Sequence, residues 1–180
     1  MLRWYVQFVE NYPLFSAVIQ FAILGTLGEA LSRKISHQKI FNFFVGLKKA
    51  IVWSILALMI KYAFVGFFGF THALVSANLL PQSAGSVVVV KAFFTSTFMN
   101  LLFGPIMIYS QRFLDNFFMR KGNDYSNIRG ALWTLVWFWI PAQTLTFSLP
   151  VNYQIGLAAL WSIVLGGILG YFESKKVLKS

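Results

Sequence analysis

Three ionisable residues lie inside long apolar stretches of the sequence: Glu29, Lys61 and Lys91. A charge within a membrane helix costs about 3 kcal/mol on insertion scales, so such residues usually have a partner, a wet cavity or a route to water. The chemistry they indicate is the passage of charged or hydrophilic solutes, or a buried ion pair. For Lys91, near one end of its stretch, a stem that simply reaches the interface is an equally good interpretation.

Lys61 and Glu29 are predicted to compensate each other. Lys61 lies about ten residues from either end of its apolar run, which places it roughly 15 Å deep at 1.5 Å per residue. Glu29 is the one acidic residue inside any of these runs and is therefore the natural partner. The alternative for Glu29 is an interfacial carboxylate that contacts lipid headgroups.

Polar side chains also recur in two further runs, and they are candidates for a polar path: Thr95, Asn100, Gln143 and Thr146. Pro105 and Pro141 are predicted to kink the same two helices, because proline removes a backbone hydrogen bond. The commoner use of such groups is hydrogen bonding between membrane helices, worth about 1 kcal/mol or less. The pattern fits either a lined path or interhelical packing.

Enzyme chemistry has little support. The sequence has no cysteine, and its two histidines, His37 and His72, fall at opposite ends of the predicted helices. Metal-ligand spacing, a phosphate-binding loop and a nucleophile elbow are all missing. We therefore predict a protein that is not an enzyme and that has no cofactor and no metal site.

The elements that must position these residues are five apolar runs, at 13–31, 50–70, 87–109, 131–149 and 155–172. Each is near the ~20 residues that an α-helix needs to cross a bilayer. Hydrophobic residues make up 58% of the chain and charged residues 11%, against about 25% charged in soluble domains. We predict one all-α domain over residues 1–180, a transmembrane bundle of about five helices.

The basic residues alternate between the loops, which predicts the orientation. Twelve of the 15 lysines and arginines fall in the loops after the first and third runs and in the tail, while Arg3 lies on the other side. The positive-inside rule then puts the C-terminus on the cytoplasm-like side and the N-terminus opposite. A four-span alternative would leave one run in the interface. The partner of these cations is a lipid bilayer and not a nucleic acid.

Small residues predict where helices approach closely. Gly25 and Gly28 lie in the first run, and Gly166 and Gly170 form a GxxxG pair in the last. Such spacing lets membrane helices pack at short range. It serves packing inside a bundle and is also compatible with a homo-oligomer.

Several residues keep the spacing of a known family. Near the C-terminus these are Trp139, Gln143, Phe147 and Tyr153; earlier ones are Trp4, Pro13, Gly28-Glu29, Gly66, Pro81 and Lys91. In this order they resemble the twenty-two-kilodalton peroxisomal membrane protein family, which includes mitochondrial inner-membrane members. Thr95-Ser96 stands where the family has Asp-Gln, and Gln154 stands where it has Arg. A shared gating mechanism is therefore not implied.

The resemblance implies a helical membrane protein, usually drawn with four spans, that forms a pore for small solutes. We accordingly expect a channel for small hydrophilic solutes or ions, with a cationic lining that favours anions. The competing hypothesis is a structural or scaffold membrane protein, and an enzyme of lipid metabolism ranks third. The sequence does not distinguish among three membranes in which the protein could lie: the mitochondrial inner, the peroxisomal and the bacterial cytoplasmic membrane.

Overall fold

The computed structural model describes residues 2–120, 122, 124–125 and 128–177 of the 180-residue chain, and no β-strand occurs in these ranges. The predicted all-α bundle is confirmed. Its helices surround a core in which Phe21, Trp53, Leu56 and Phe147 are buried. Two of the predicted cation-side residues, Lys121 and Lys179, lie outside the described residues.

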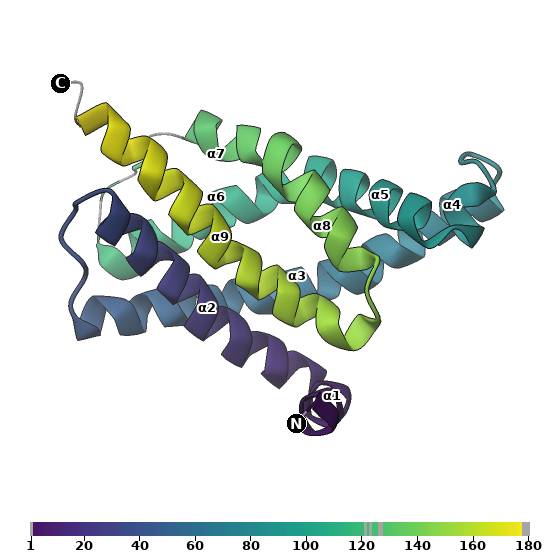
Figure 1. The fold of residues 1–180 in the computed structure, drawn as a ribbon, viewed down its shortest axis with the longest axis horizontal. Helices are drawn as coiled ribbons and strands as arrows, with labels where there is room; N and C mark the ends of the chain where they lie inside the picture. Colours follow the sequence, from purple (N-terminus) through teal and green to yellow (C-terminus); the bar gives the residue numbers. More distant parts are fainter. Residues whose placement is uncertain (1, 121, 123, 126–127, 178–180) are drawn as a thin grey trace.

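The helices follow one another with short connections (Figure 1). In chain order they are α1 Leu2–Asn11, α2 Pro13–Ile35, α3 Phe43–Ser76, α4 Ser83–Ser86, α5 Val88–Phe98, the π-helical turn η1 Met99–Phe103, α6 Gly104–Met119, α7 Ile128–Thr134, the π-helical turn η2 Leu135–Trp139, α8 Ile140–Phe147 and α9 Val151–Val177.

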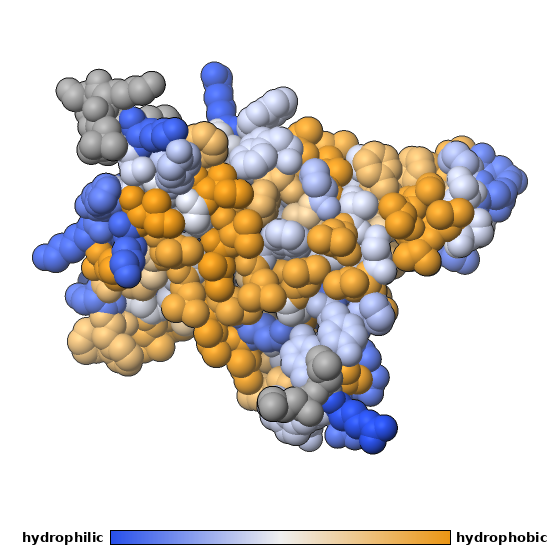
Figure 2. Space-filling view, viewed as in Figure 1, coloured by the Kyte–Doolittle hydropathy of each residue, from blue (hydrophilic) through white to orange (hydrophobic). Residues whose placement is uncertain are grey.

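Four helical segments of the described chain are long and apolar enough to cross a membrane: Pro13–Ile35, Phe43–Ser76, Val88–Met119 and Val151–Lys175. Figure 2 shows the apolar surface that they form, with hydrophilic residues gathered towards the ends of the molecule. The fourth predicted run folds as the helical segment 128–147, in which η2 joins α7 to α8. Like Val88–Met119 it contains a π-helical turn, and it is less apolar than the four segments named above.

The parallel pair α2 and α9 is held together by glycines. A Cβ on Gly28 would meet the backbone carbonyl of Ser162, and a Cβ on Gly166 would meet the carbonyl of Gly28. One turn further along both helices, Gly170 lies against Ser32. Because residue numbers rise together along the contact, the two helices run in the same direction (Figure 1). Backbones this close leave no room for a side chain.

Each of the two prolines predicted to kink a helix directly follows a π-helical turn. Pro105 lies in the first turn of α6, after η1, and Pro141 lies in the first turn of α8, after η2. A π turn absorbs one extra residue, which accommodates the carbonyl group that proline leaves without a donor. The two π turns pack against each other. They place an irregular backbone in the middle of the bundle. In other proteins, π-helical turns are frequent at functional sites.

Helix α1 lies against the starts of α2 and α9. The Tyr5 hydroxyl donates to Gln20 Oε1 at 3.0 Å, and Asn152 Nδ2 donates to Glu10 Oε1 at 2.8 Å. Burial raises the pKa of the Tyr5 hydroxyl, and nearby Tyr153 adds to this, while the hydrogen bond to Gln20 partly opposes it. The neutral phenol is therefore the form that holds α1 in place.

Candidate functional site

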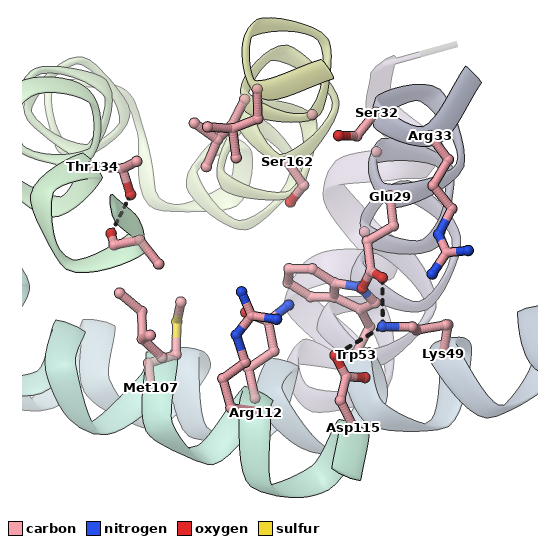
Figure 3. A pocket seen from close by; sticks show the side chains of 18 of the residues that line it. Glu29, Ser32, Arg33, Lys49, Trp53, Met107, Arg112, Asp115, Thr134 and Ser162 are labelled. Carbon is pink, nitrogen blue, oxygen red and sulfur yellow. Dashed lines mark hydrogen bonds and ion pairs between the residues drawn. The ribbon is translucent and has the colours of Figure 1, made fainter. Parts of the chain in front are cut away.

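A charged pocket opens among α2, α3, α6 and α9, at the end of the bundle that carries the basic loops. It has a volume of about 310 Å³, and we call it the vestibule (Figure 3). Its charged lining residues are Glu29, Arg33, Lys49, Arg112, Asp115 and Asp124. Helix α6 contributes through its last turns, residues 110–119, which extend past the apolar run predicted to end at residue 109.

Lys49 links three helices at the wall of the vestibule. Its Nζ lies 2.6 Å from Glu29 Oε2 and 2.8 Å from Asp115 Oδ2, and its side chain is 9% exposed. The indole Nε1 of Trp53, one turn along α3, donates to Glu29 Oε1 at 2.8 Å. One buried ammonium faces two carboxylates, so removing Lys49 would leave both carboxylates without a cation.

The predicted pairing of Glu29 with Lys61 is wrong. Glu29 pairs with Lys49, which directly precedes the apolar run 50–70 and was therefore expected in a loop. Helices α2 and α3 are antiparallel, so that Gly25 faces Trp53 and Glu29 faces the first turns of α3. Lys61 lies three turns further along α3, towards the opposite end of the bundle.

Arg33 and Arg112 are the vestibule cations that have no carboxylate partner among the described residues. The Arg112 guanidinium extends from α6 towards the middle of the pocket (Figure 3). Arg33 also lines the vestibule, but its guanidinium donates to the Lys39 carbonyl at 3.5 Å and lies over the Phe41 ring. Arg112 therefore offers hydrogen-bond donors in a planar fork, the geometry that suits carboxylate and phosphate groups.

Below the vestibule lies an inner cavity of about 30 Å³, the volume of about one water molecule. Trp53, Met107 and Trp139 line both spaces and separate them. Asn100 and Gln143 are the polar side chains of the inner cavity. Two amides, one from each kinked helix, therefore line a small space on the other side of these three side chains.

Gln143 brings an unsatisfied polar atom to this cavity. The side chain is buried, and its Oε1 has no hydrogen-bond partner in the described part of the chain. The Asn100 amide is satisfied differently, because Nδ2 donates to the Ser96 carbonyl at 2.9 Å. A buried carbonyl without a donor is costly unless water or a solute supplies one.

The two π turns shape the inner cavity. Asn100 and Phe103 of η1, with Leu135 and Trp139 of η2, all line it. The Ser96 hydroxyl donates to the Ile140 carbonyl at 2.8 Å and ties the two irregular helices together. The kinked helices therefore meet where the polar side chains enter the core.

Three phenylalanines close the bundle beyond the inner cavity. Phe147 packs edge-on against Phe64 and Phe68, with ring centroids 4.7 and 5.0 Å apart. Phe64 and Phe147 each follow a cavity residue, Ile60 and Gln143, by one helical turn. We call Phe64, Phe68 and Phe147 the aromatic plug.

On the far side of the plug is a groove of about 480 Å³, which we call the outer groove. Lys61 and Lys91 line it together with Phe64, Phe68, Phe147 and the turn between α8 and α9. Lys61 is 18 residues from the start of α3 and 15 from its end, so it lies near the middle of the candidate span Phe43–Ser76, and its depth in a membrane stays a prediction.

Thr95 and Thr146 line none of these three spaces. Thr95 is fully buried and donates to Thr71 Oγ1 at 3.0 Å. Thr146 donates to the Ala142 carbonyl and accepts from Trp161 Nε1, at 2.9 and 3.0 Å. Both serve contacts between and within helices.

Sequence reasoning missed Lys49, Asp115 and Arg112, because all three lie just beyond the apolar runs. A detectable signal was present: Arg112 and Asp115 are three residues apart, and so share one helix face. The sequence also spaces Lys49 and Trp53 four residues apart. Within the described ranges no group of His, Asp and Glu could hold a metal ion.

Comparison with known proteins gives no further assignment: no family model, no curated protein and no solved structure matches the chain.

Proposed function

We propose that this protein is a channel for small hydrophilic solutes or ions in a membrane. The observation that carries the proposal is the succession of vestibule, inner cavity, plug and outer groove along the bundle. The vestibule and the inner cavity share three lining residues. The inner cavity is separated from the outer groove by one turn of α3 and one turn of α8. The unpaired Gln143 carbonyl lies where a solute would pass.

The arrangement corresponds to a closed state. The inner cavity holds about one water, and the plug fills the bundle beneath it. A hydrophobic constriction of this kind gates by excluding water, and it opens when its side chains move apart. Helix α8 carries Phe147 between a π turn and the α8–α9 turn, so it is the helix whose movement would open the path.

Anions are the proposed solute class. In the vestibule Lys49 is compensated by Glu29 and Asp115, while Arg112 extends into the space without such a partner in the described chain. The outer groove adds Lys61 and Lys91. The described vestibule lining holds three cations and three carboxylates, so the excess positive charge that would favour anions lies in the outer groove.

A five-span topology belongs to this proposal. Helices α2 and α9 run in the same direction. If both cross the membrane, the chain crosses it an odd number of times between the start of α2 and the end of α9. Segment 128–147 then supplies the crossing between α6 and α9, although it is less apolar than the four other segments. The resemblance to the twenty-two-kilodalton peroxisomal membrane protein family also points to a pore, in an organelle membrane.

A scaffold role is the second candidate, and hydrogen bonding in the core favours it. Thr95 and Ser96 donate to groups on other helices, and Thr146 accepts from the Trp161 indole of α9, as interhelical packing residues do. None of these bonds needs a solute.

Solute flux through liposomes distinguishes the two. Phe147→Ala should raise anion efflux from vesicles containing the purified protein, because it removes the central ring of the plug. The matched control is Phe93→Ala, which removes an exposed ring from α5. Equal efflux from both variants and the parent protein, at every ionic condition and voltage, would favour the scaffold.

A further inference from the structure

The outer groove has the lining of an amphiphile site. Its walls are aliphatic and aromatic: Phe64, Val65, Phe68, Val88, Phe147, Leu149, Pro150, Val151 and Ile155. Its polar lining groups are Lys61, Lys91 and Gln154. A site for a small hydrophilic solute would carry more hydrogen-bonding groups than this.

The two lysines are uncompensated. None of the described residues that line the groove is acidic, and neither lysine forms an ion pair within the described chain. Lys91 Nζ lies 5.7 Å from the centre of the Phe68 ring, so one wall of the groove holds this cation over an aromatic face. Two half-buried ammonium groups beside one apolar space attract a single anion that both can reach.

The position of the groove suits a lipid headgroup. It opens beside the turn between α8 and α9 and beside the start of α5. These helix ends lie on the side of the bundle opposite the basic loops. Its apolar walls continue along exposed side chains of the α3–α5 pair, with Val65 66% and Val88 61% exposed. A chain of methylenes can follow this surface while its headgroup stays near the turn.

We propose that the outer groove binds one anionic phospholipid, with its phosphate between Lys61 and Lys91 and an acyl chain against Phe68 and Val65. Charge complementarity selects the occupant. A lipid with a net negative headgroup compensates the lysines, whereas a zwitterionic lipid brings its own cation next to them. A lipid held there would occupy the outer end of the proposed path, so lipid binding and anion flux are measured separately and either proposal can fail alone.

The binding test uses the whole protein purified in detergent and native mass spectrometry with added phosphatidylglycerol or phosphatidylcholine. We expect one phosphatidylglycerol to be retained in preference to phosphatidylcholine. Lys61→Met combined with Lys91→Met should weaken retention by about fivefold per lysine. The matched control, Lys48→Met with Lys175→Met, removes the same charge from two exposed lysines at the other end and should retain the lipid.

A second variant tests the same site if the double methionine variant misfolds. The Lys61→Arg, Lys91→Arg protein keeps both charges and should retain phosphatidylglycerol. Equal retention of the two lipids, or equal loss in the two methionine proteins, would overturn the proposal. Displacement of the lipid by millimolar inorganic phosphate would also overturn it, since the site would then recognise a free anion. Preferential retention of a fatty acid would reject the phospholipid as occupant.

Discussion

The vestibule and the outer groove both hold lysine within the bundle, but they treat its charge in opposite ways. In the vestibule Lys49 lies between Glu29 and Asp115 and is nearly inaccessible. In the outer groove Lys61 and Lys91 are half-buried and face aromatic and aliphatic side chains. The comparison teaches that a compensated charge holds helices together, whereas an uncompensated one is available to a ligand.

The largest expected effect separates the two lysine environments directly. Lys49→Met leaves two carboxylates near each other without a cation, so we expect a loss of about 3–5 kcal/mol in unfolding free energy. Lys61→Met removes no ion pair among the described residues and should cost much less. Thermal melting of both variants in the same detergent measures the difference.

A rescue sharpens this result. Adding Glu29→Gln and Asp115→Asn to Lys49→Met removes the whole charge cluster, so most of the lost stability should return. Equal melting temperatures for Lys49→Met and Lys61→Met would break the comparison, because they would show that the ion pairs contribute little.

The next effect concerns the α2–α9 contact, which forms one wall of the vestibule. Gly28→Ala would place a methyl group against the backbone of Ser162 and should destabilise the protein by about 1–3 kcal/mol. Gly66→Ala is the matched control, because nothing lies within 4 Å of its added Cβ. That control should be neutral or stabilising by up to about 1 kcal/mol. Similar melting of the two alanine proteins would contradict the close parallel packing.

A smaller effect distinguishes a polar side chain that lines the cavity, Gln143, from one that holds helices together, Thr146. Gln143→Met removes a buried carbonyl that has no donor in the described chain, so stability should change by less than about 1 kcal/mol. Thr146→Val removes the acceptor of the Trp161 indole and should cost about 1 kcal/mol. Anion flux should change in the Gln143 variant and not in the Thr146 variant. Lowered stability of Gln143→Met with unchanged flux would assign Gln143 to packing.

The smallest effect is a pH dependence of the α1 contact. The folded state raises the pKa of Tyr5 above its ordinary value of 10.0 and so favours the neutral phenol. The resulting stabilisation is complete below pH 10 and is lost as the pH rises through the folded pKa. Melting curves from pH 8 to 11 should show this loss, and Tyr5→Phe should remove that part of the dependence. An identical pH profile for the two proteins would exclude a role for Tyr5.

The sequence predicts the all-α class well, because runs of about 20 apolar residues need helices in lipid. It fails at the ends of those runs. The final turns of α6 carry Arg112 and Asp115 and the first turns of α3 carry Lys49, yet hydropathy assigns all three to loops. The wrong partner for Glu29 follows from that boundary, since pairing across two helices depends on their relative stagger. The π turns have no simple sequence signal beyond the prolines that follow them.

The central claim is that the path past Gln143 conducts, and the natural lack of cysteine allows a direct test. Gln143→Cys protein in planar bilayers is exposed to a small, charged thiol reagent from the side that carries the basic loops, while current is recorded. We predict an anion current that the reagent reduces, and no reduction for Phe93→Cys, whose side chain lies on the exposed surface of α5. A current that is unchanged by modification of Gln143→Cys, or no current from either protein, would contradict a conducting path through the inner cavity.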